Sequence, residues 1–230
     1  MKRVILLMGC MFVFALEANA QSGYCGPKDE NGDYGTNCQW NYDFETKTLK
    51  ISGTGNMYNT NHTHDYPWSK GTSYYNDIEN VVIEEGITRI GQHAFMYAKG
   101  LKNIVLPNSL KDIYANALNG GTQLTSIIIP DSVKRIIGSE EYPPFDSTIT
   151  ELYCSEAQQN MCRQALKLSG LDEGVLKTYQ KYGSSYYYDG KFYVSPKDIG
   201  SDNYIKKRIY TVDEANKVAG KKNSVKIKYK

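Results

Sequence analysis

One hydrophobic pattern is written three times between Ile78 and Ile136, each time 23 residues further along the chain. Four columns keep this step: Val81, Ile104 and Ile127; Ile83, Leu106 and Ile129; Ile87, Leu110 and Val133; Ile90, Ile113 and Ile136. The pair Ala94-Phe95 also returns, as Ala117-Leu118. A fixed period of this length predicts a solenoid, in which each unit stacks its apolar side on the next.

Each unit starts with a short alternation of inward and outward positions, as at Val81 and Ile83. A period of two predicts a short strand in every unit, and stacked units make these strands parallel. Pro107 follows the second strand and ends it, because proline has no N–H to donate to a ladder. Residues 92–97 and 114–119 are expected to form a single helical turn on the outer side of each unit.

Two ten-residue stretches carry a family resemblance. Residues 127–136 read IIIPDSVKRI, and residues 86–95 read GITRIGQHAF. They resemble the BspA-like leucine-rich repeats of secreted and surface proteins from bacteria and trichomonads. The resemblance implies an α+β repeat fold, a short leucine-rich-repeat solenoid with a parallel strand stack. It also implies adhesion to host or matrix proteins, or to neighbouring cells.

The repeats depart from the family pattern at two places. Most family repeats have Cys or another small residue after the Ala-Phe pair, whereas this chain has Ala98 and Gly121. The second unit also has Leu118 where the family has Phe. Looser packing is expected there.

Residues 39–55 predict a β-hairpin in front of the repeats. Trp40 and Tyr42 alternate on one side of the turn, and Leu49 and Ile51 alternate on the other. This stretch also resembles the segment that precedes the first repeat in BspA-like proteins. A solenoid needs such an N-terminal cap, because its first strand would otherwise present unpaired backbone groups and an apolar face.

The period breaks after residue 136 and resumes late. Leu152 and Cys154 stand 25 residues after Ile127 and Ile129, which predicts a fourth stacked strand. Residues 155–168 then carry apolar side chains at helical spacing. They predict an amphipathic helix that closes the solenoid, with Ser155 at its N-cap.

Residues 171–230 differ in composition from the repeats. They hold 13 Lys or Arg and 7 Asp or Glu, a formal net charge of +6. Strands are expected at 186–188, 192–194, 209–210 and 224–229, with a capping box at 211–214. We expect a small basic C-terminal α+β appendage, rich in tyrosine. Its charge suits an anionic surface or glycosaminoglycan, or is simply a solvated strand edge; without a base-stacking motif, nucleic acid is not expected as a partner.

The chain therefore divides into four predicted parts: residues 1–20, 21–77, 78–170 and 171–230, as signal peptide, N-terminal cap, leucine-rich-repeat solenoid and appendage. A basic start, an apolar run and Ala18-Asn19-Ala20 predict secretory cleavage before Gln21. A lipoprotein site at Cys10 fits less well, since the apolar run continues past it. No transmembrane segment is expected in the mature chain, which leaves a secreted or cell-surface location.

Cleavage before Gln21 removes Cys10 and leaves four cysteines, an even number that favours two disulfides in an exported chain. Pairing Cys25 with Cys38 would tie the polar loop 26–37, and pairing Cys154 with Cys162 would tie the fourth strand to the helix. Buried free thiols are the alternative, because sequence does not fix pairing.

The inventory for catalysis or metal binding is short. His93 is expected at the surface of the first outer turn. His62, His64 and Asp65 lie in a polar loop without a second cluster at zinc spacing, so no metal site and no cofactor are predicted. Asp29 opens a calcium-like run, but the required Gly and bidentate Glu are missing, and a turn is expected instead.

The strands also predict where a partner binds. Residues between the inward positions point outward in a parallel stack. Four of them form one column on the expected concave face: Val82, Val105, Ile128 and Tyr153. Hydrogen-bonding residues lie two positions earlier: Asn80, Asn103, Ser126 and Glu151. An apolar stripe with a polar edge is typical of an interface. Two alternatives stay open: β-branched residues also suit exposed strands without any partner, and the C-terminal appendage could cover the column.

We therefore expect a non-catalytic binding or adhesion module whose partner is an extracellular protein or a surface glycan. The rival hypothesis is a glycan hydrolase that uses Glu84, Glu85 or Glu151. Glycosidases need two carboxyl groups facing each other roughly 5 to 9.5 Å apart. Glu84 and Glu85 follow a strand and precede Gly86, which fits a solvated turn better. The sequence makes no prediction of oligomeric state.

Overall fold

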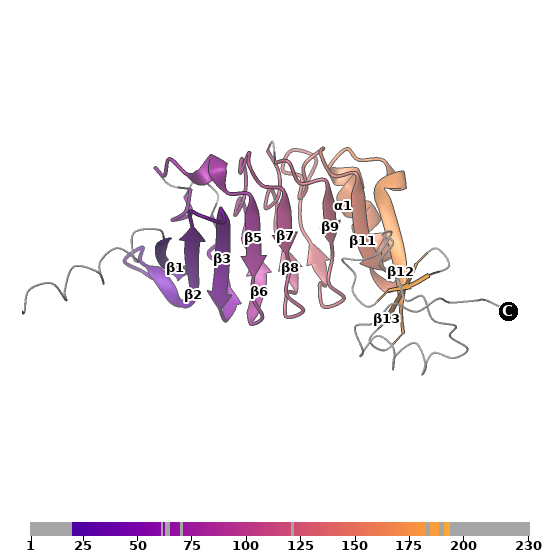
Figure 1. Cartoon of the computed structure of the whole chain (residues 1–230), viewed down its shortest axis with the longest axis horizontal. Helices are drawn as coiled ribbons and strands as arrows, with labels where there is room; N and C mark the ends of the chain where they lie inside the picture. The colour runs from indigo at the N-terminus through magenta and orange to yellow at the C-terminus, as the bar shows by residue number, and fades with distance from the viewer. Residues whose placement is uncertain are drawn as a thin grey trace, which may run out of the picture.

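The computed structural model describes residues 20–193 apart from 61, 63–64, 70, 121, 183–184 and 189–190. Its strands are β1 (Ala20–Lys28), β2 (Tyr34–Asp43), β3 (Thr48–Gly53), β4 (Gly55–Asn56), β5 (Asn80–Ile83), β6 (Ile87–Ile90), β7 (Asn103–Val105), β8 (Asp112–Ile113), β9 (Ser126–Ile128), β10 (Arg135–Ile136), β11 (Glu151–Ser155), β12 (Leu176–Tyr182), β13 (Ser185–Tyr188) and β14 (Lys191–Tyr193). The helices are η1 (Tyr75–Asp77), η2 (Glu156–Gln158), α1 (Gln159–Leu168) and η3 (Glu173–Val175). Figure 1 shows one elongated row of strands that runs from β1 to β12, hereafter the front row.

The predicted repeat strands stack in parallel and in the predicted register. Val81 of β5 lies opposite Ile104 of β7, 23 residues later. Ile127 of β9 lies opposite Leu152 of β11, which confirms the fourth strand and its offset of 25 residues. The leucine-rich-repeat plan with a parallel strand stack is therefore confirmed.

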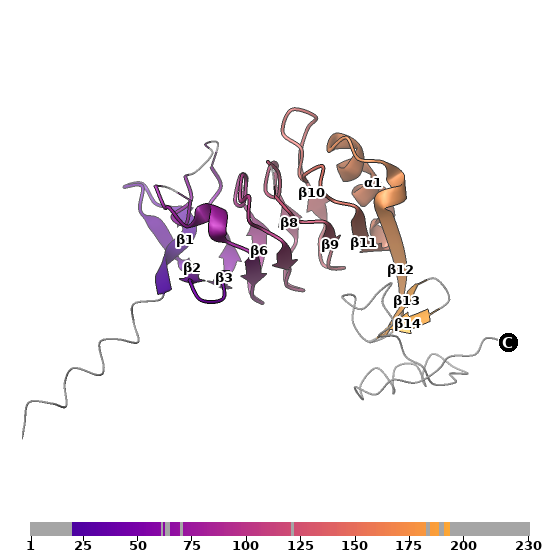
Figure 2. The same ribbon diagram turned by 45° about the horizontal axis from the view of Figure 1, so that its top comes forward.

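A second sheet forms the back of the solenoid and was not predicted. It contains β4, β6, β8 and β10, all parallel, in the order β10-β8-β6-β4. Ile90 and Ile113 are paired on this sheet and are fully buried. Figure 2 shows β6, β8 and β10 lying apart from the front row. The hydrophobic column that the sequence placed after each front strand is thus part of a second ladder.

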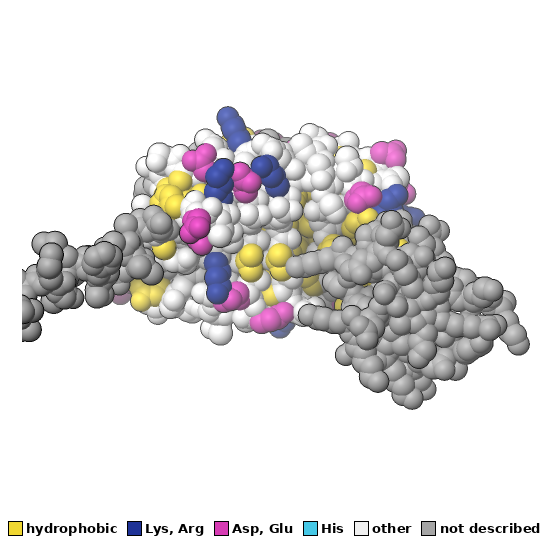
Figure 3. Space-filling view, viewed as in Figure 1, with side chains coloured by type: hydrophobic (Ala, Val, Ile, Leu, Met, Phe, Trp, Pro, Cys, Tyr) yellow, Lys and Arg dark blue, Asp and Glu magenta, His cyan; other side chains and the backbone are white. Residues whose placement is uncertain are grey.

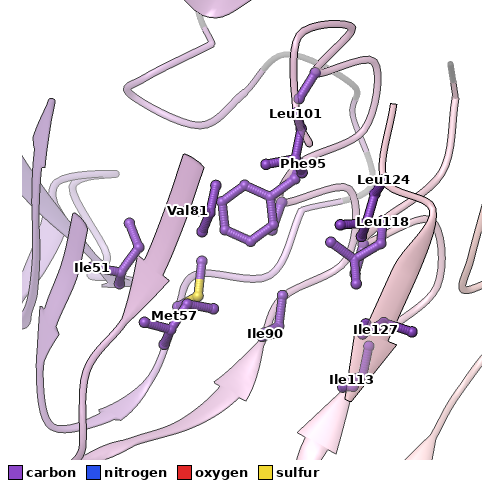
Figure 4. Close-up of a cluster of buried hydrophobic side chains, with 14 of the residues drawn as sticks. Ile51, Met57, Val81, Ile90, Phe95, Leu101, Ile113, Leu118, Leu124 and Ile127 are labelled. Atoms are coloured by element: carbon purple, nitrogen blue, oxygen red, sulfur yellow. The ribbon is translucent and has the colours of Figure 1, made fainter. Parts of the chain in front are cut away.

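The core fills the space between the front row and the back sheet. Figure 4 shows Ile51 and Val81 of the front row and Ile90 of the back sheet around the same space, with Phe95 of an outer turn among them. All four side chains are at most 1% exposed. Each unit therefore contributes apolar side chains from its front strand, its back strand and its turn, as stacking requires.

The outer segment at residues 92–97 is a turn, so the predicted single helical turn is wrong. His93 and Tyr97 have φ angles of 61° and 63°, in the left-handed region that a right-handed helix excludes. One repeat later, Asn116 has φ 53° and Gly120 has φ 96°. A Cβ atom on Gly120 would lie 2.4 Å from the ring of Tyr97, so the stacking of the two turns requires glycine there.

Neighbouring turns bond to each other in addition to the bonds within each turn, such as that from the N–H of Met96 to the carbonyl of His93 at 3.2 Å. The N–H of His93 donates to the carbonyl of Ala115 at 3.1 Å, and that of Phe95 to the carbonyl of Ala117 at 3.0 Å. The turn also buries His93, which is 5% exposed, so its predicted surface position is wrong. Its Nδ1 lies 3.2 Å from the carbonyl oxygen of Thr60, because the loop before the repeats folds over the turn.

The N-terminal hairpin forms between β2 and β3 as predicted, with Trp40 opposite Ile51. Because β3 also pairs in parallel with β5, the hairpin extends the front row and covers its first repeat strand. β1 adds a further antiparallel strand on β2, so part of the expected loop 26–37 is strand. The calcium-like run is a turn, as expected, in which Asp29 accepts the N–H groups of Asn31 and Asp33.

The predicted amphipathic helix follows β11 as η2 and α1, and buries Cys162, Ala165 and Leu166. Ser155 is the predicted N-cap. Its backbone N–H donates a hydrogen bond to the side-chain oxygen of Gln158. None of the described helices is long and apolar enough to span a lipid bilayer.

The front row continues beyond the predicted boundary at residue 171. β12 pairs in parallel with β11, and Leu152 lies opposite Leu176. β13 and β14 follow as an antiparallel pair over two of the predicted strand segments, and Tyr186 lies opposite Tyr193. The predictions for the signal peptide at 1–19, the strands at 209–210 and 224–229, and the capping box lie outside the described residues.

Candidate functional site

The outward column predicted from the repeats lies on the face of the front row that points away from the core. Val82 of β5 lies opposite Val105 of β7, and both side chains are half-buried. Ile128 of β9 is half-buried in the same column. Figure 3 shows hydrophobic side chains across the middle of this face, with charged side chains above and below them.

A groove of about 920 Å³ opens on this face over β7 and β9. It brings together four of the predicted site residues: Asn103, Val105, Ser126 and Ile128. The other lining residues are Ile83, Glu84, Glu85, Ile104, Leu106, Pro107, Asn108, Pro130, Asp131, Tyr179 and Tyr186. Asn80 and Val82 lie on the same face one strand away and do not line the groove.

The last two predicted site residues, Tyr153 and Glu151, belong to a different environment. Tyr153 is only 6% exposed, because it packs in a cluster with Tyr179 and Tyr193. Its hydroxyl donates to Glu151 at 2.9 Å. β12, β13 and β14 cover this end of the column, so Tyr153 does not offer a free surface to a partner. At this end of the column the expected alternative holds, in which the segment after residue 171 covers the outward side chains, although β12 itself was not predicted.

The groove lies at a junction between two separate strand ladders. Among the described residues, β7 is the last strand of the sheet β1-β2-β3-β5-β7, and β9 is the last strand of the sheet β14-β13-β12-β11-β9. The two strands are neighbours in the front row (Figure 1), but no ladder joins them. We call this position the β7/β9 junction.

The missing bonds can be located by comparison with the adjacent repeats. The carbonyl of Glu79 accepts the N–H groups of Lys102 and Asn103, which begin β7, and the carbonyl of Thr125 accepts two N–H groups from the start of β11 in the same way. Lys102 is the equivalent residue in the repeat between them. In the described part of the chain, its carbonyl accepts no N–H from the start of β9. The two units are joined just before this point, where the N–H of Gln123 donates to the carbonyl of Leu101 at 2.8 Å, so the break in bonding is confined to β7 and β9.

The junction also exposes part of the core. Ile104 and Leu106 point inward and pack on the core, yet both are half-buried and both line the groove. Val81 and Ile127, the equivalents of Ile104 in the neighbouring units, are 1% exposed. The groove is therefore lined by apolar side chains from the inward and the outward face of β7. A partner that covers them would remove apolar surface from water.

Three carboxylates lie along the groove. Glu84 pairs with Lys50 at 2.7 Å, and Asp131 pairs with Lys181 at 3.0 Å. Glu85 has no ion-pair partner among the described residues. Lys, Arg and His are absent from the described residues that line the groove, so its edge is negatively charged.

Glu85 is instead held by neutral donors from the next repeat. Its carboxylate accepts the N–H and the side-chain amide of Asn108 at 2.8 and 3.1 Å, and the N–H of Ser109 at 3.0 Å. These bonds lower the pKa of Glu85, and the bond from the N–H of Asn108 has the largest effect. The side chain is thus a fixed anion at neutral pH, the opposite of the raised pKa that a glycosidase general acid needs.

Two tyrosines form one wall of the groove, and both come from the segment beyond residue 171. The rings of Tyr179 and Tyr186 meet edge to face with centroids 5.2 Å apart. Burial raises the pKa of Tyr179, so its hydroxyl stays protonated and lies 3.3 Å from Asp131 as a donor. β12 reads LKTYQKY, which has no period-two alternation of apolar and polar residues, so only the Tyr-rich composition pointed to this wall.

The remaining candidate chemistry does not gather at one place. His62 is exposed in the loop before the repeats, and His64 lies outside the described residues. Asp65 pairs with Lys28 at 3.4 Å. Across residues 20–193, with the gaps given above, no three His, Cys, Asp or Glu side chains are arranged to hold a metal ion.

The four cysteines of the predicted mature chain form the two spatial pairs that the sequence suggested. The sulfur atoms of Cys25 and Cys38 lie 2.8 Å apart, which is a contact between thiols and longer than the bond of about 2.05 Å in a disulfide. Cys154 and Cys162 also contact each other through their side chains. All four are fully buried.

Comparison with known proteins gives one family and several related structures. The family described as BspA type leucine rich repeat region matches residues 69–189, in six copies. No curated protein matches the chain.

Among solved structures, the chain is similar to a leucine-rich repeat protein from Eubacterium ventriosum, with 14% identity and a TM-score of 0.45 over 69% of this chain and 46% of the other. It is also similar to a leucine rich cell surface protein from Faecalibacterium prausnitzii, with 20% identity and a TM-score of 0.30 over 52% and 27%. The T. pallidum leucine rich repeat protein shares 17% identity, with a TM-score of 0.26 over 53% and 71%. The chain thus spans less than half the length of the first two structures.

Proposed function

Because the chain belongs to the BspA-type leucine-rich repeat family, we propose that it is an exported protein-binding module that holds an extracellular protein in the groove at the β7/β9 junction. In this proposal residues 1–20 are removed as a signal peptide, and the mature chain acts at the cell surface or in the medium. The partner is a protein of the host, the matrix or a neighbouring cell. Binding needs neither a cofactor nor a catalytic step.

The groove is the observation that carries this proposal. It combines an apolar floor at Val105 and Ile128 with amide and hydroxyl groups at Asn103 and Ser126, and with the carboxylate of Glu85 at its edge. Protein interfaces have this plan, an apolar centre within a polar rim. The volume of about 920 Å³ accommodates several side chains of a partner.

The junction adds a reason to expect an extended partner segment. The groove crosses β7 and β9 and is lined by residues of both strands and of the loops that follow them, so an extended segment can lie along it. Side chains of such a segment alternate, so that one face enters the groove while the other stays in solvent. We therefore favour a partner that presents an exposed strand or an extended loop.

Two matched substitutions test the location of the site. Val105→Asp places a charge on the groove floor, and Val82→Asp places the same charge on the adjacent strand, outside the groove. Both side chains are half-buried, so both variants are expected to melt within a few degrees of the parent. Burial of an unpaired carboxylate costs about 3 kcal/mol, so Val105→Asp should weaken partner binding about 100-fold while Val82→Asp retains it.

The measurement is binding of the mature chain and both variants to immobilised extracellular-matrix proteins and to a glycan array. Loss of protein binding in Val105→Asp alone supports the proposal. Equal binding by both variants would place the site elsewhere on the chain. Binding to array glycans without binding to any protein would favour the alternative, a secreted glycan-binding protein, for which Tyr179 and Tyr186 would supply the aromatic wall.

A further inference from the structure

The groove has an unusual requirement for its occupant. Its floor takes apolar side chains, and its described lining carries the carboxylates of Glu84, Glu85 and Asp131 with no basic side chain. Two of these carboxylates are paired with Lys50 and Lys181, whereas Glu85 contacts only neutral donors in the described chain. An occupant that matches this lining is extended, apolar on one face and cationic on the other.

The chain itself contains a segment of this kind. Residues 225–230 read VKIKYK, so Val225, Ile227 and Tyr229 alternate with three lysines. In an extended conformation the three apolar side chains share one face and the lysines share the opposite face. Residues 194–230 as a whole hold ten Lys or Arg and four Asp or Glu, a formal net charge of +6.

The stretch 194–230, which ends in this segment, follows a strand that lies beside the groove. Tyr193 is the last described residue, and it lies opposite Tyr186, which lines the groove. The 31 residues from 194 to 224 separate it from Val225. At about 3.3 Å per residue, such a connection reaches about 100 Å, far more than the distance across one groove requires. Reach therefore places no limit on this contact.

We propose that residues 225–230 bind as an extended strand in the groove at the β7/β9 junction and compete there with the partner. Val225, Ile227 and Tyr229 cover the floor at Val105 and Ile128. The three lysines remain at the mouth of the groove, within about 8 Å of its carboxylates, where attraction is not fully screened at physiological salt. The inference rests on the groove of the proposed function and adds an inhibitor built into the same chain.

The test compares two forms of the chain that start at Gln21: the full chain to Lys230 and a chain that ends at Gly220. The probe is a fluorescent peptide with the sequence of residues 221–230, followed by anisotropy. The internal segment acts at an effective concentration on the order of 1 mM, so if the free peptide binds with a Kd of about 100 µM, the full chain should bind it about tenfold more weakly than the shortened chain. Circular dichroism melts check that the shortened chain keeps the fold.

Substitutions locate the contact. Val105→Asp in the shortened chain should lower peptide affinity at least about tenfold, whereas Val82→Asp should not. Ile227→Asp in the full chain should free the groove and raise peptide binding to that of the shortened chain. Binding should also weaken between 50 and 500 mM salt, because the lysines contribute by charge.

Several results would overturn the proposal. One is equal peptide affinity of the full and shortened chains, and another is no binding to a folded shortened chain. A third is peptide binding that Val105→Asp leaves unchanged. A dimer of the full chain that becomes monomeric on shortening would show that the segment binds a second copy instead. Because the experiment uses only this chain and its own peptide, it is independent of whether an extracellular partner is captured.

Discussion

The sulfur atoms of Cys25 on β1 and Cys38 on β2 lie 2.8 Å apart in a fully buried contact. The contact and burial raise the pKa of the Cys25 thiol, so little thiolate is present at neutral pH. We predict that export makes this pair a disulfide, with a dithiol oxidant taking up the two electrons and two protons. Closing a loop of this size should add about 3 kcal/mol to stability. The same change is predicted for Cys154 and Cys162.

Intact mass and thiol alkylation of the secreted chain check this prediction. The expected chain begins at Gln21, lacks four hydrogen atoms relative to the reduced form and has no alkylated cysteine after denaturation without reductant. Cys38→Ser should lower the melting temperature of the oxidised chain more than that of the reduced chain. Two or more alkylated cysteines in the secreted chain, denatured without reductant, would contradict it.

The sequence predicted the front strands from their period, and it missed the back strands and β12. Val81, Ile104 and Ile127 recur with a fixed step, and a strand, its direction and its register follow from that. The back sheet was missed because strands of two residues, such as Asp112–Ile113, have no alternation to read. The sequence showed the hydrophobic columns that start at Ile87 and Ile90, but it did not show that a second sheet forms there.

The site was predicted in part for the same reason. Val105 and Ile128 are periodic and were found, whereas the carboxylates that complete the groove come from loops and its tyrosines come from β12 and β13. β12 buries Tyr179, and four of its seven residues are Lys, Thr or Gln, because the strand lies at the end of the front row and is partly in water. The β7/β9 junction is a break in hydrogen bonding that no sequence pattern marks.

The second prediction concerns His93, whose position in the repeat is filled by Asn116 one unit later. Burial, the main cause, lowers the pKa of His93 from its ordinary 6.5. The folded state therefore holds the ring neutral while the unfolded state takes up a proton. Stability from this side chain is present above about pH 6.5 and lost as pH falls through the folded pKa.

His93→Asn should remove this pH dependence without breaking the turn. Asn tolerates the left-handed backbone that His93 adopts, as Asn116 does at φ 53°. Urea unfolding at pH 7.5, 6 and 5 measures the effect. The parent should lose stability over this range more steeply than the variant. Parallel pH profiles of parent and His93→Asn would reject the assignment.

The third prediction concerns Asp112 on the back sheet, which joins two arginines of adjacent units. Arg135 binds it through two bonds of 2.8 Å, and Arg89 lies 3.7 Å away. The bonds from Arg135 are the main cause of a lowered pKa at Asp112. Its stabilisation is therefore present above about pH 3.8, the ordinary value, and is lost as pH falls through the folded pKa.

Asp112→Asn should lower the free energy of unfolding by about 1 to 2 kcal/mol at pH 7, because two arginines lose their shared carboxylate. The difference from the parent should shrink below pH 4. Arg135→Lys keeps the charge and loses the paired geometry, so it should cost less than Asp112→Asn. Chemical denaturation at pH 7 and pH 3 measures both, and a difference that is the same at the two pH values would refute the role of the carboxylate.

The last prediction tests whether the β7/β9 junction really exposes the core. Ile104 and Ile127 occupy the same column of successive repeats, but Ile104 is half-buried at the groove and Ile127 is 1% exposed. Ile127→Ala should cost about 3 to 4 kcal/mol, as expected for a buried isoleucine. Ile104→Ala should cost about half as much, because the parent side chain already contacts water and less apolar surface is lost. Urea denaturation at pH 7 gives both values. Equal losses would mean that the junction is closed in solution, and the groove would then be too shallow to hold the apolar face of an extended segment, whether from a partner or from residues 225–230.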